Sequence, residues 1–214
     1  MPTTAQEARS LIGRVIADEE TVGNGARRAT PYESDPRTRV ILSGGCVWQR
    51  TELPDDVLAN LKRSFEIRRA KGKGTLRLSA EVTVLRTRLG ASWEQARMAE
   101  EALQCPEQTL RAGERLTGLT SGAYAWGEGS NLFSDDNLIE SGRCVSDTHG
   151  GPYLYWWNQA TFGPVVLSAA VCGGSERERD ASVDLVQSYF TQMLRRVKDE
   201  LAAPAASATT GEGS

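Results

Sequence analysis

The chain has 214 residues, 39% of them hydrophobic, and 25 Lys and Arg side chains nearly balance 28 Asp and Glu side chains. This composition predicts one ordinary globular domain and excludes disordered, fibrous and solenoid proteins. The net charge of −3 lacks the basic excess that neutralises phosphates, so we expect no nucleic-acid binding. No run approaches the ~20 apolar residues of a membrane span, and the first residues lack a basic region followed by an apolar one. We therefore expect neither a membrane span nor a signal peptide in this chain.

The first element is predicted to be an amphipathic helix over Ala5–Asp18. Thr4 and Glu7 have the spacing of a capping box, and an apolar stripe at helical spacing follows: Leu11, Ile12, Val15 and Ile16. A Gly- and Pro-rich stretch then predicts a loop, followed by one short strand or a strand pair near residues 39–48.

The strongest pattern is period-two alternation on both sides of Lys71–Gly74. Apolar residues occupy mostly odd positions from Val57 to Ile67 and even positions from Leu76 to Val84. This alternation predicts a long antiparallel hairpin with one polar face. A helix over residues 55–65 remains an alternative, because Val57, Leu58, Leu61 and Phe65 also form a helical stripe.

The second half of the chain is predicted to hold two helices and a set of strands. One helix begins near Ser92 and ends at Cys105, before Pro106. Short strands are expected at 115–119 and 121–126, then a three-strand meander at 138–147, 153–161 and 165–172. A final helix covers residues 179–201, and the Ala/Pro/Ser/Thr/Gly-rich residues 202–214 are expected to be disordered.

These elements predict an α+β fold, an antiparallel sheet made of the long hairpin and the meander with helices packed on one face. The predicted organisation is an N-terminal helix and loop (1–37), a single α+β domain (38–201) and a tail (202–214).

The four cysteines are widely spaced and contain no CxxC pair, which disfavours a zinc site. The cysteines either form two disulfides or remain as four reduced, buried thiols, and the spacing alone does not decide between these alternatives. Of three connectivities we favour Cys46–Cys105 and Cys144–Cys172, because each bridge then stays within one half of the chain. In a simple meander, however, the strands carrying Cys144 and Cys172 flank a third, whereas a disulfide needs Cα atoms within about 7 Å. Either the strand order differs or the second bridge is wrong.

No catalytic or metal-binding motif accompanies the candidate reactive groups. His149 lies in a turn context, without a nucleophile motif beside it. The acids Glu128, Asp135, Asp136 and Glu140 lie close together in a Gly/Ser-rich segment, do not match a calcium loop, and are read as solvated loop charges. We therefore predict no enzyme activity, no catalytic residue, no metal and no cofactor.

The aromatic run at residues 153–157 is the most informative candidate for binding. In a strand, Tyr153, Tyr155 and Trp157 share one face while Trp156 takes the other. Such side chains pack under helices or line a ligand cleft. The predicted ligand- or partner-binding residues come from this strand and the Gly-rich segment: Tyr124, Trp126, Tyr153, Tyr155 and Trp157.

Over residues 38–201 the layout resembles the small disulfide-containing extracytoplasmic domains of actinobacteria, namely the sensor domains of receptor Ser/Thr kinases and related cell-envelope lipoproteins. The resemblance rests on Cys46-Val47-Trp48, the hairpin, a helix ending in Cys105, the meander and a long terminal helix. It implies a ligand-binding or protein-interaction module with a cleft and no catalytic residues.

Two functional hypotheses follow. The first is a non-enzymatic module of the cell envelope that binds a small ligand or a protein partner, extracytoplasmic if the disulfides form. The second is a cytosolic interaction or assembly protein that docks through an exposed N-terminal helix or the aromatic strand.

Overall fold

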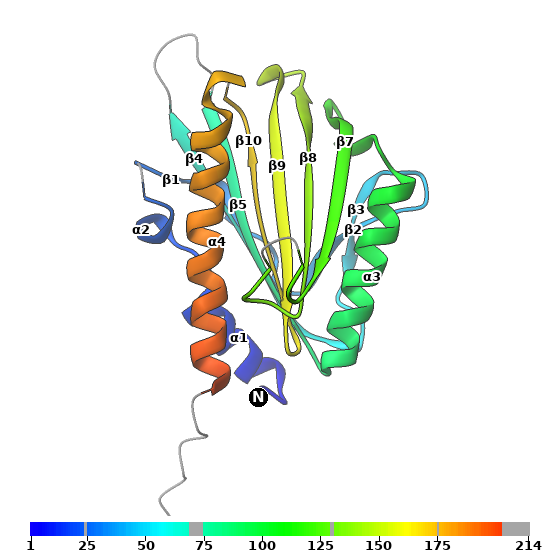
Figure 1. Ribbon diagram of the computed structural model, residues 1–214, viewed down its shortest axis with the longest axis vertical. Coiled ribbons are helices and arrows are strands. Elements are labelled where there is room, and N and C mark those ends of the chain that lie inside the picture. The colour runs from blue at the N-terminus through cyan, green and yellow to red at the C-terminus, as the bar shows by residue number, and fades with distance from the viewer. Residues whose placement is uncertain (24, 69–74, 129–130, 175, 203–214) are drawn as a thin grey trace, which may run out of the picture.

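The computed structural model describes residues 1–23, 25–68, 75–128, 131–174 and 176–202 (Figure 1). The helices are α1 (Ala5–Val15), α2 (Glu19–Val22), α3 (Arg88–Gln104), α4 (Arg179–Ala202) and a short 3-10 helix (Glu176–Glu178). The strands are β1 (Arg27–Glu33), β2 (Thr38–Leu42), β3 (Trp48–Glu52), β4 (Val57–Arg68), β5 (Thr75–Leu85), β6 (Gln108–Arg111), β7 (Glu114–Ala125), β8 (Asp136–Ser146), β9 (Gly150–Phe162) and β10 (Val165–Cys172). The predicted tail, from residue 203 on, lies outside the described residues.

Eight of these strands form one antiparallel sheet in the order β1-β4-β5-β10-β9-β8-β7-β6. The predicted hairpin is β4–β5 and the predicted meander is β8–β9–β10, so both are confirmed, and the helical alternative for residues 55–65 is wrong. Strand β10 pairs with β5 from Val165↔Val84 to Cys172↔Arg77 and joins the two units. Strands β2 and β3 form a separate hairpin.

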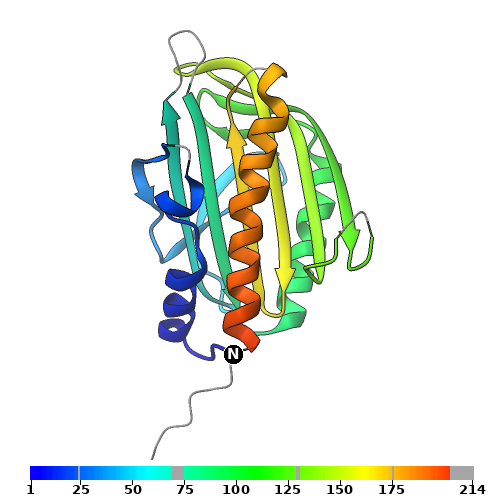
Figure 2. The same cartoon turned by 60° about the vertical axis from the view of Figure 1, so that its left-hand side comes forward.

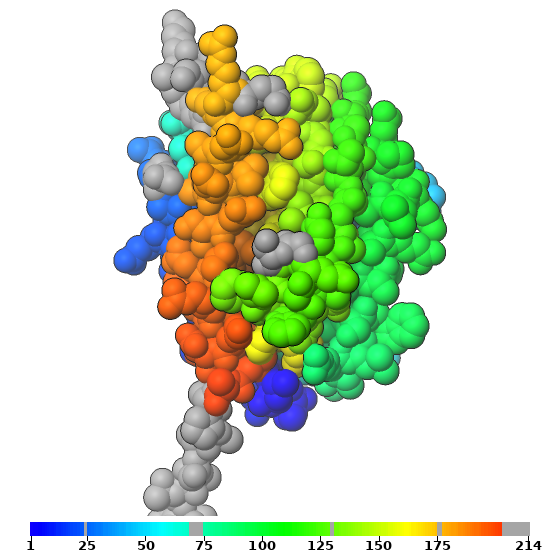
Figure 3. All heavy atoms as spheres, in the orientation of Figure 1, coloured from blue at the N-terminus to red at the C-terminus, as the bar shows by residue number. Residues whose placement is uncertain are grey.

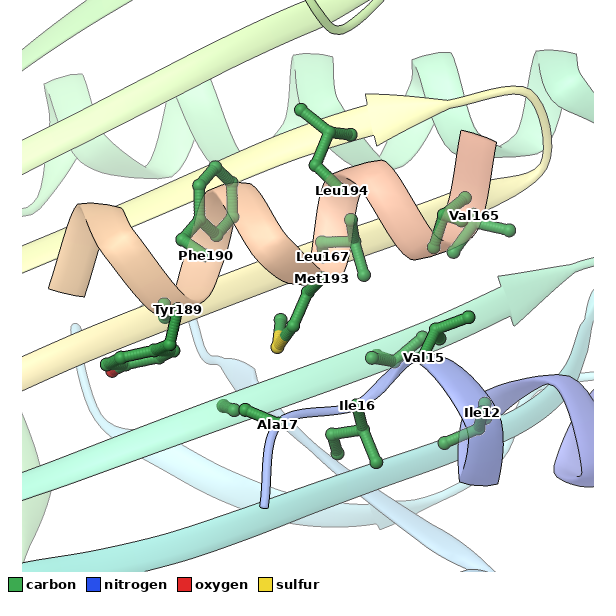
Figure 4. Close-up of a cluster of buried hydrophobic side chains, with 14 of the residues drawn as sticks. Ile12, Val15, Ile16, Ala17, Val165, Leu167, Tyr189, Phe190, Met193 and Leu194 are labelled. Carbon is green, nitrogen blue, oxygen red and sulfur yellow. The ribbon is translucent and has the colours of Figure 1, made fainter. Parts of the chain in front are cut away.

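The main core lies between one face of the sheet and helices α1 and α4. Strand alternation directs the even positions of β5 and the odd positions of β10 to this face, where they form one buried cluster with both helices. In Figure 4, α4 crosses in front of the strand that carries Val165 and Leu167, and its Tyr189 and Met193 point toward the side where Ile12, Val15 and Ile16 lie. The Tyr189 hydroxyl donates to the backbone carbonyls of Ser79 and Ala170, so this buried polar atom is satisfied.

Helix α1 begins as the sequence predicts, with a capping box formed by Thr4 and Glu7. Its apolar stripe is inside this core: Leu11, Ile12 and Val15 are all at most 2% exposed. The stripe is therefore buried and is not the exposed docking surface that the second hypothesis offers as one of its two alternatives. Strand β1 pairs with β4, so the segment 1–37 also contributes an edge strand to the sheet.

The opposite face of the sheet carries α3 and the β2–β3 hairpin. Val166 of β10 packs with Ala91 of α3, and Gln159 of β9 donates to Gln95 of α3 at 2.8 Å. Val165 and Leu167 point to the face covered by α4, whereas Val166 between them points to the face covered by α3. Helices therefore cover both sides of the sheet, and Figure 2 shows α4 in front of it and α3 behind. The expected packing of all helices on one face is not confirmed.

Three local expectations need correction. Helix α3 begins at Arg88 with Thr87 as its N-cap, rather than near Ser92. The two short strands expected at 115–126 form one strand, β7, whose register shifts between Thr117 and Thr120 around Gly118, a glycine with φ of +59°. Strand β1 was not expected, because Pro31 interrupts its pattern; an edge strand tolerates proline since one side of its backbone needs no partner.

The cysteines pair as favoured, Cys46 with Cys105 and Cys144 with Cys172. The strand order is nevertheless the simple meander, with β9 between the strands that carry Cys144 and Cys172. Two strand spacings in a flat sheet would separate them by about 10 Å, but their Cα atoms are 6.0 Å apart. The sheet curls toward the α3 face at this end, which brings β8 and β10 together across β9.

Candidate binding groove

Helix α3 presents one row of side chains toward the β2–β3 hairpin. Gly90, Glu94, Arg97 and Glu101 are spaced three or four residues apart, which places them on one side of a helix, and Trp93 adjoins Glu94 at the edge of that side. Trp93 is 69% exposed, which is unusual for the largest apolar side chain.

The facing wall comes from the hairpin and the segment that follows it. Arg39 of β2 pairs with Thr51 of β3, and Ile41 points to the same side two residues later. The wall continues through Glu52, Pro54 and Asp56. Between the walls lies an open groove of about 500 Å³, within the size range of small-molecule sites.

The two walls of the groove are linked to each other at both ends. The Cys46–Cys105 disulfide links the β2–β3 turn to the C-cap of α3, and the Thr109 N–H donates to the Cys46 carbonyl beside it. At the other end, the Arg86 backbone N–H donates to the Asp56 carbonyl at 2.9 Å, just before α3 begins. The distance between the two walls is therefore held by covalent and backbone links.

A ladder of alternating charges crosses the groove: Arg39, Glu94, Arg97 and Glu101. Glu94 forms ion pairs with Arg39 and, at 2.6 Å, with Arg97; Arg97 also pairs with Glu101. Burial alone would raise the pKa of Glu94, but the two guanidinium groups hold it below the usual range. Burial raises the pKa of Glu101, and Arg97 only partly opposes this effect.

A small inner cavity of about 50 Å³ lies behind this ladder, against the sheet. Arg39 and Glu94 line both spaces and so form the partition between them. The inner cavity is bounded on the sheet side by Trp157 and Gln159 of β9 together with Glu81 of β5.

Three of the predicted aromatic residues lie together on the α3 face. Tyr153, Tyr155 and Trp157 belong to a satellite cluster around Leu116 and Cys144, while Trp156 packs into the main core on the opposite face. The predicted alternation is confirmed. Of the three, Trp157 lines the inner cavity, whereas Tyr155 is buried.

The other two predicted residues lie elsewhere. Tyr124 pairs with Asn137, which is on the α4 side of the sheet, and Trp126 is 68% exposed where β7 ends. In Figure 3, α4 covers part of that side and leaves strands β8 and β9 visible beside it. The structure does not bring all five predicted residues into one site.

The acids read as loop charges have different environments. Asp135 pairs with Arg88 and accepts from the Gly163 N–H, and Glu128 accepts from the Ala125 N–H, as loop residues do. Glu140 instead lies within β8, only 2% exposed, on the α3 face. Its closest donor is the Ser121 hydroxyl at 3.4 Å, and burial raises its pKa to about 7.

Sequence reasoning missed the groove because its residues come from three separated segments without a motif. The available signal was Trp93, an indole on a helix face whose neighbours Glu94 and Arg97 are charged. His149 is exposed in a turn, and the described residues hold no group of three or more potential metal ligands. Within the same residues, no helix has the length and hydrophobicity to cross a bilayer. Neither a family model nor a curated protein matches the sequence.

Proposed function

We propose that the protein is a non-enzymatic binding module of the cell envelope, and that its ligand or partner group occupies the groove between α3 and the β2–β3 hairpin. The observation that carries this proposal is the open volume of about 500 Å³ between two walls that are linked at both ends. A preformed site loses little conformational entropy when it binds, which favours recognition.

The cysteines support the proposed compartment. All four are paired in the structure, and disulfides persist in oxidising compartments. This pairing supports an extracytoplasmic position and the resemblance to actinobacterial sensor-like domains.

A binding role agrees with the chemistry of the groove better than catalysis does. Its arginines are engaged in ion pairs with Glu94 and Glu101, and the residues that line it include no Ser–His or Cys–His arrangement. A docking role for the N-terminal helix has less support, because its apolar stripe packs inside the chain's own core.

Blocking the groove tests the proposal. Thr51 is half-buried on the groove side of β3, whereas Arg50 is exposed and points to the opposite side. A fragment library screened by NMR against the 15N-labelled full chain is expected to yield ligands that shift the Thr51 and Gly90 amides. Thr51→Trp should abolish these shifts, and Arg50→Trp should preserve them. Ligands that bind only at other surfaces, or that bind Thr51→Trp unchanged, would refute the proposal.

A further inference from the structure

Exposed large apolar side chains gather at one end of the molecule. Among the described residues, seven such side chains are more than half exposed. Five of them make up a surface that we call the apolar end: Met1, Leu89, Trp126, Leu132 and Phe133. The other two are Trp93, which lines the groove, and Leu103 near the end of α3. Exposed apolar side chains that gather in one patch mark an interaction site, whereas scattered ones need no explanation.

Contacts around the β9–β10 turn bring the segments of the apolar end together. Asp135 forms an ion pair with Arg88, the first residue of α3, and accepts from the Gly163 N–H at 2.9 Å. The Trp126 N–H donates to the Asp135 carbonyl at 3.1 Å, and the Met1 side chain lies over Gly163. In Figure 3 the loop between β7 and β8 (green) lies beside the lower part of α4 (orange to red) and above the first residues of the chain (dark blue).

Hydrogen bonds fix the outward position of the apolar side chains in residues 131–135. The Asn131 Nδ2 group donates to the Tyr124 and Ser134 carbonyls, both at 3.2 Å, while its Oδ1 accepts from the backbone N–H of Ser134 at 3.1 Å. The hydroxyl of Ser134 donates to the same oxygen at 2.7 Å, and Ser134 is buried. Because the polar groups of this segment are turned inward, the exposure of Leu132 and Phe133 is built into the loop.

A cation borders the apolar end. The Lys198 ammonium lies 5.7 Å from the centre of the Phe133 ring and 5.6 Å from that of Phe162, and it forms no ion pair with a carboxylate in the described part of the chain. Apolar side chains beside an ammonium group complement a phospholipid surface, in which phosphates lie above acyl chains. Trp side chains also favour this interface. We propose that the apolar end docks on a phospholipid bilayer, where the loop side chains enter among the acyl chains and Lys198 meets the phosphates.

The chain itself supplies no apolar cover for this end. Helix α4 ends here, since Leu201 lies next to Gly163, and residues 203–214 that follow consist of Ala, Pro, Ser, Thr, Gly and one Glu. Peptides are usually bound along a sheet edge or in a groove, whereas the apolar end is built from a loop, the first residues and the first turn of α3. The inference takes the envelope location from the proposed function, which puts a bilayer nearby, and does not depend on the groove.

Sedimentation of the full chain with vesicles of phosphatidylcholine and phosphatidylglycerol measures docking. The wild type is expected to sediment with the vesicles. Leu132→Ser/Phe133→Ser should weaken binding at least about tenfold, because burial of each such side chain contributes that much. Lys198→Gln should weaken it about fivefold through the lost attraction to phosphates. Leu103→Ser removes an exposed apolar side chain near the other end of α3, so this matched control should bind like the wild type.

Fluorescence quenching by lipids with brominated acyl chains locates the inserted residue with conservative variants. Trp126 is exposed in the apolar end, so its indole should be quenched when the wild type binds these vesicles. Trp126→Phe should therefore lose most of the quenching and still sediment with the vesicles. Trp93→Phe is the matched control, because it removes an equally exposed indole from the groove, and it should be quenched like the wild type.

Several outcomes would overturn the inference. Wild-type protein that stays in the supernatant at millimolar lipid would reject a bilayer, and so would Leu132→Ser/Phe133→Ser or Trp126→Phe behaving like the wild type in the two assays. Dimers that Leu132→Ser/Phe133→Ser dissociates in light scattering, without vesicle binding, would assign the apolar end to a second copy of the chain. The proposed function fails separately, since Thr51→Trp blocks only the groove and should bind vesicles like the wild type.

Discussion

Glu140 is a carboxyl group buried between the sheet and α3, and no cation lies beside it within the described residues. The groups that face it are the Ser121 hydroxyl on β7, the buried Tyr155 on β9 and the Glu101 carboxylate on α3. Burial is the main cause that raises its pKa from 4.5 to about 7, and the Glu101 charge adds to the shift. The protonated form is therefore the one that this position stabilises.

This burial predicts a pH-dependent stability. An acid whose pKa is higher in the folded than in the unfolded state stabilises the fold at low pH. The stabilisation is lost as the pH rises from 4.5 through about 7. Glu140→Gln keeps the shape and removes the charge. Its free energy of unfolding should approach that of the wild type at pH 5 and exceed it by up to about 3 kcal/mol at pH 8.

Urea denaturation at the two pH values measures this difference. Glu100→Gln serves as the control, because it removes an exposed carboxylate from the neighbouring helix. If Glu140→Gln changed stability by the same amount at both pH values, Glu140 would not be a buried titrating group.

The sequence alone could not identify Glu140. In the sequence it stands among Glu128, Asp135 and Asp136, and the Gly- and Ser-rich composition around them indicates a solvated loop. Its burial depends on α3 packing across β8, a contact between residues about 40 positions apart that no local pattern records.

At the level of elements, the Cys46–Cys105 disulfide joins the β2–β3 hairpin to the end of α3. Its loop spans 59 residues, and closing a loop of that length is expected to stabilise the fold by about 4 kcal/mol. The double variant Cys46→Ala/Cys105→Ala should therefore unfold at lower denaturant concentration. It should also release the C-terminal half of α3, because this helix buries few residues and only one long apolar side chain, Met98, besides Ala91, Gln95 and Ala102.

Hydrogen exchange of the α3 amides measures this release. Cys144→Ala/Cys172→Ala is the matched control, since its 28-residue loop contributes a comparable stability but joins two strands, β8 and β10, and not α3. Equal exchange rates for α3 in the two variants, at equal global stability, would show that the Cys46–Cys105 bridge does not hold the groove wall.

The composition of α3 also explains which elements the sequence could predict. The β4–β5 hairpin, the meander, α1 and α4 have clear periodicity because each buries a continuous apolar face. Helix α3 buries mainly small and polar residues and exposes Leu89, Trp93 and Leu103, so its apolar pattern does not mark the buried face. For that reason neither its packing on the second face nor the groove beside it could be predicted.

At the level of the whole molecule, the Cys144–Cys172 bridge depends on the curl of the sheet. In a flat sheet, two strands separated by a third are too far apart for a disulfide. Here the Cα atoms of Cys144 and Cys172 are only 6.0 Å apart, although β9 lies between their strands. Cys172 also accepts a hydrogen bond from Arg77 at 2.9 Å, and Arg77 pairs with the buried Glu114 of β7. Side chains of β5 and β7 thus lie around the bridge on the concave face of the sheet. The curvature of the sheet depends on several strands together, so the pattern of any single strand does not predict it.

The paired cysteines predict the thiol state of the native protein. Protein taken from its natural compartment should incorporate no alkylating agent without reductant and four alkyl groups per chain after reduction and unfolding, because all four cysteines are bridged. Intact mass spectrometry measures both states, and a non-reducing peptide map should join residue 46 to 105 and 144 to 172. Protein secreted by an oxidising host is the control that shows the bridges can form. A native pool with reactive thiols, beside a fully bridged control, would contradict the envelope location while leaving the fold intact, since reduced disulfides mark the cytosol.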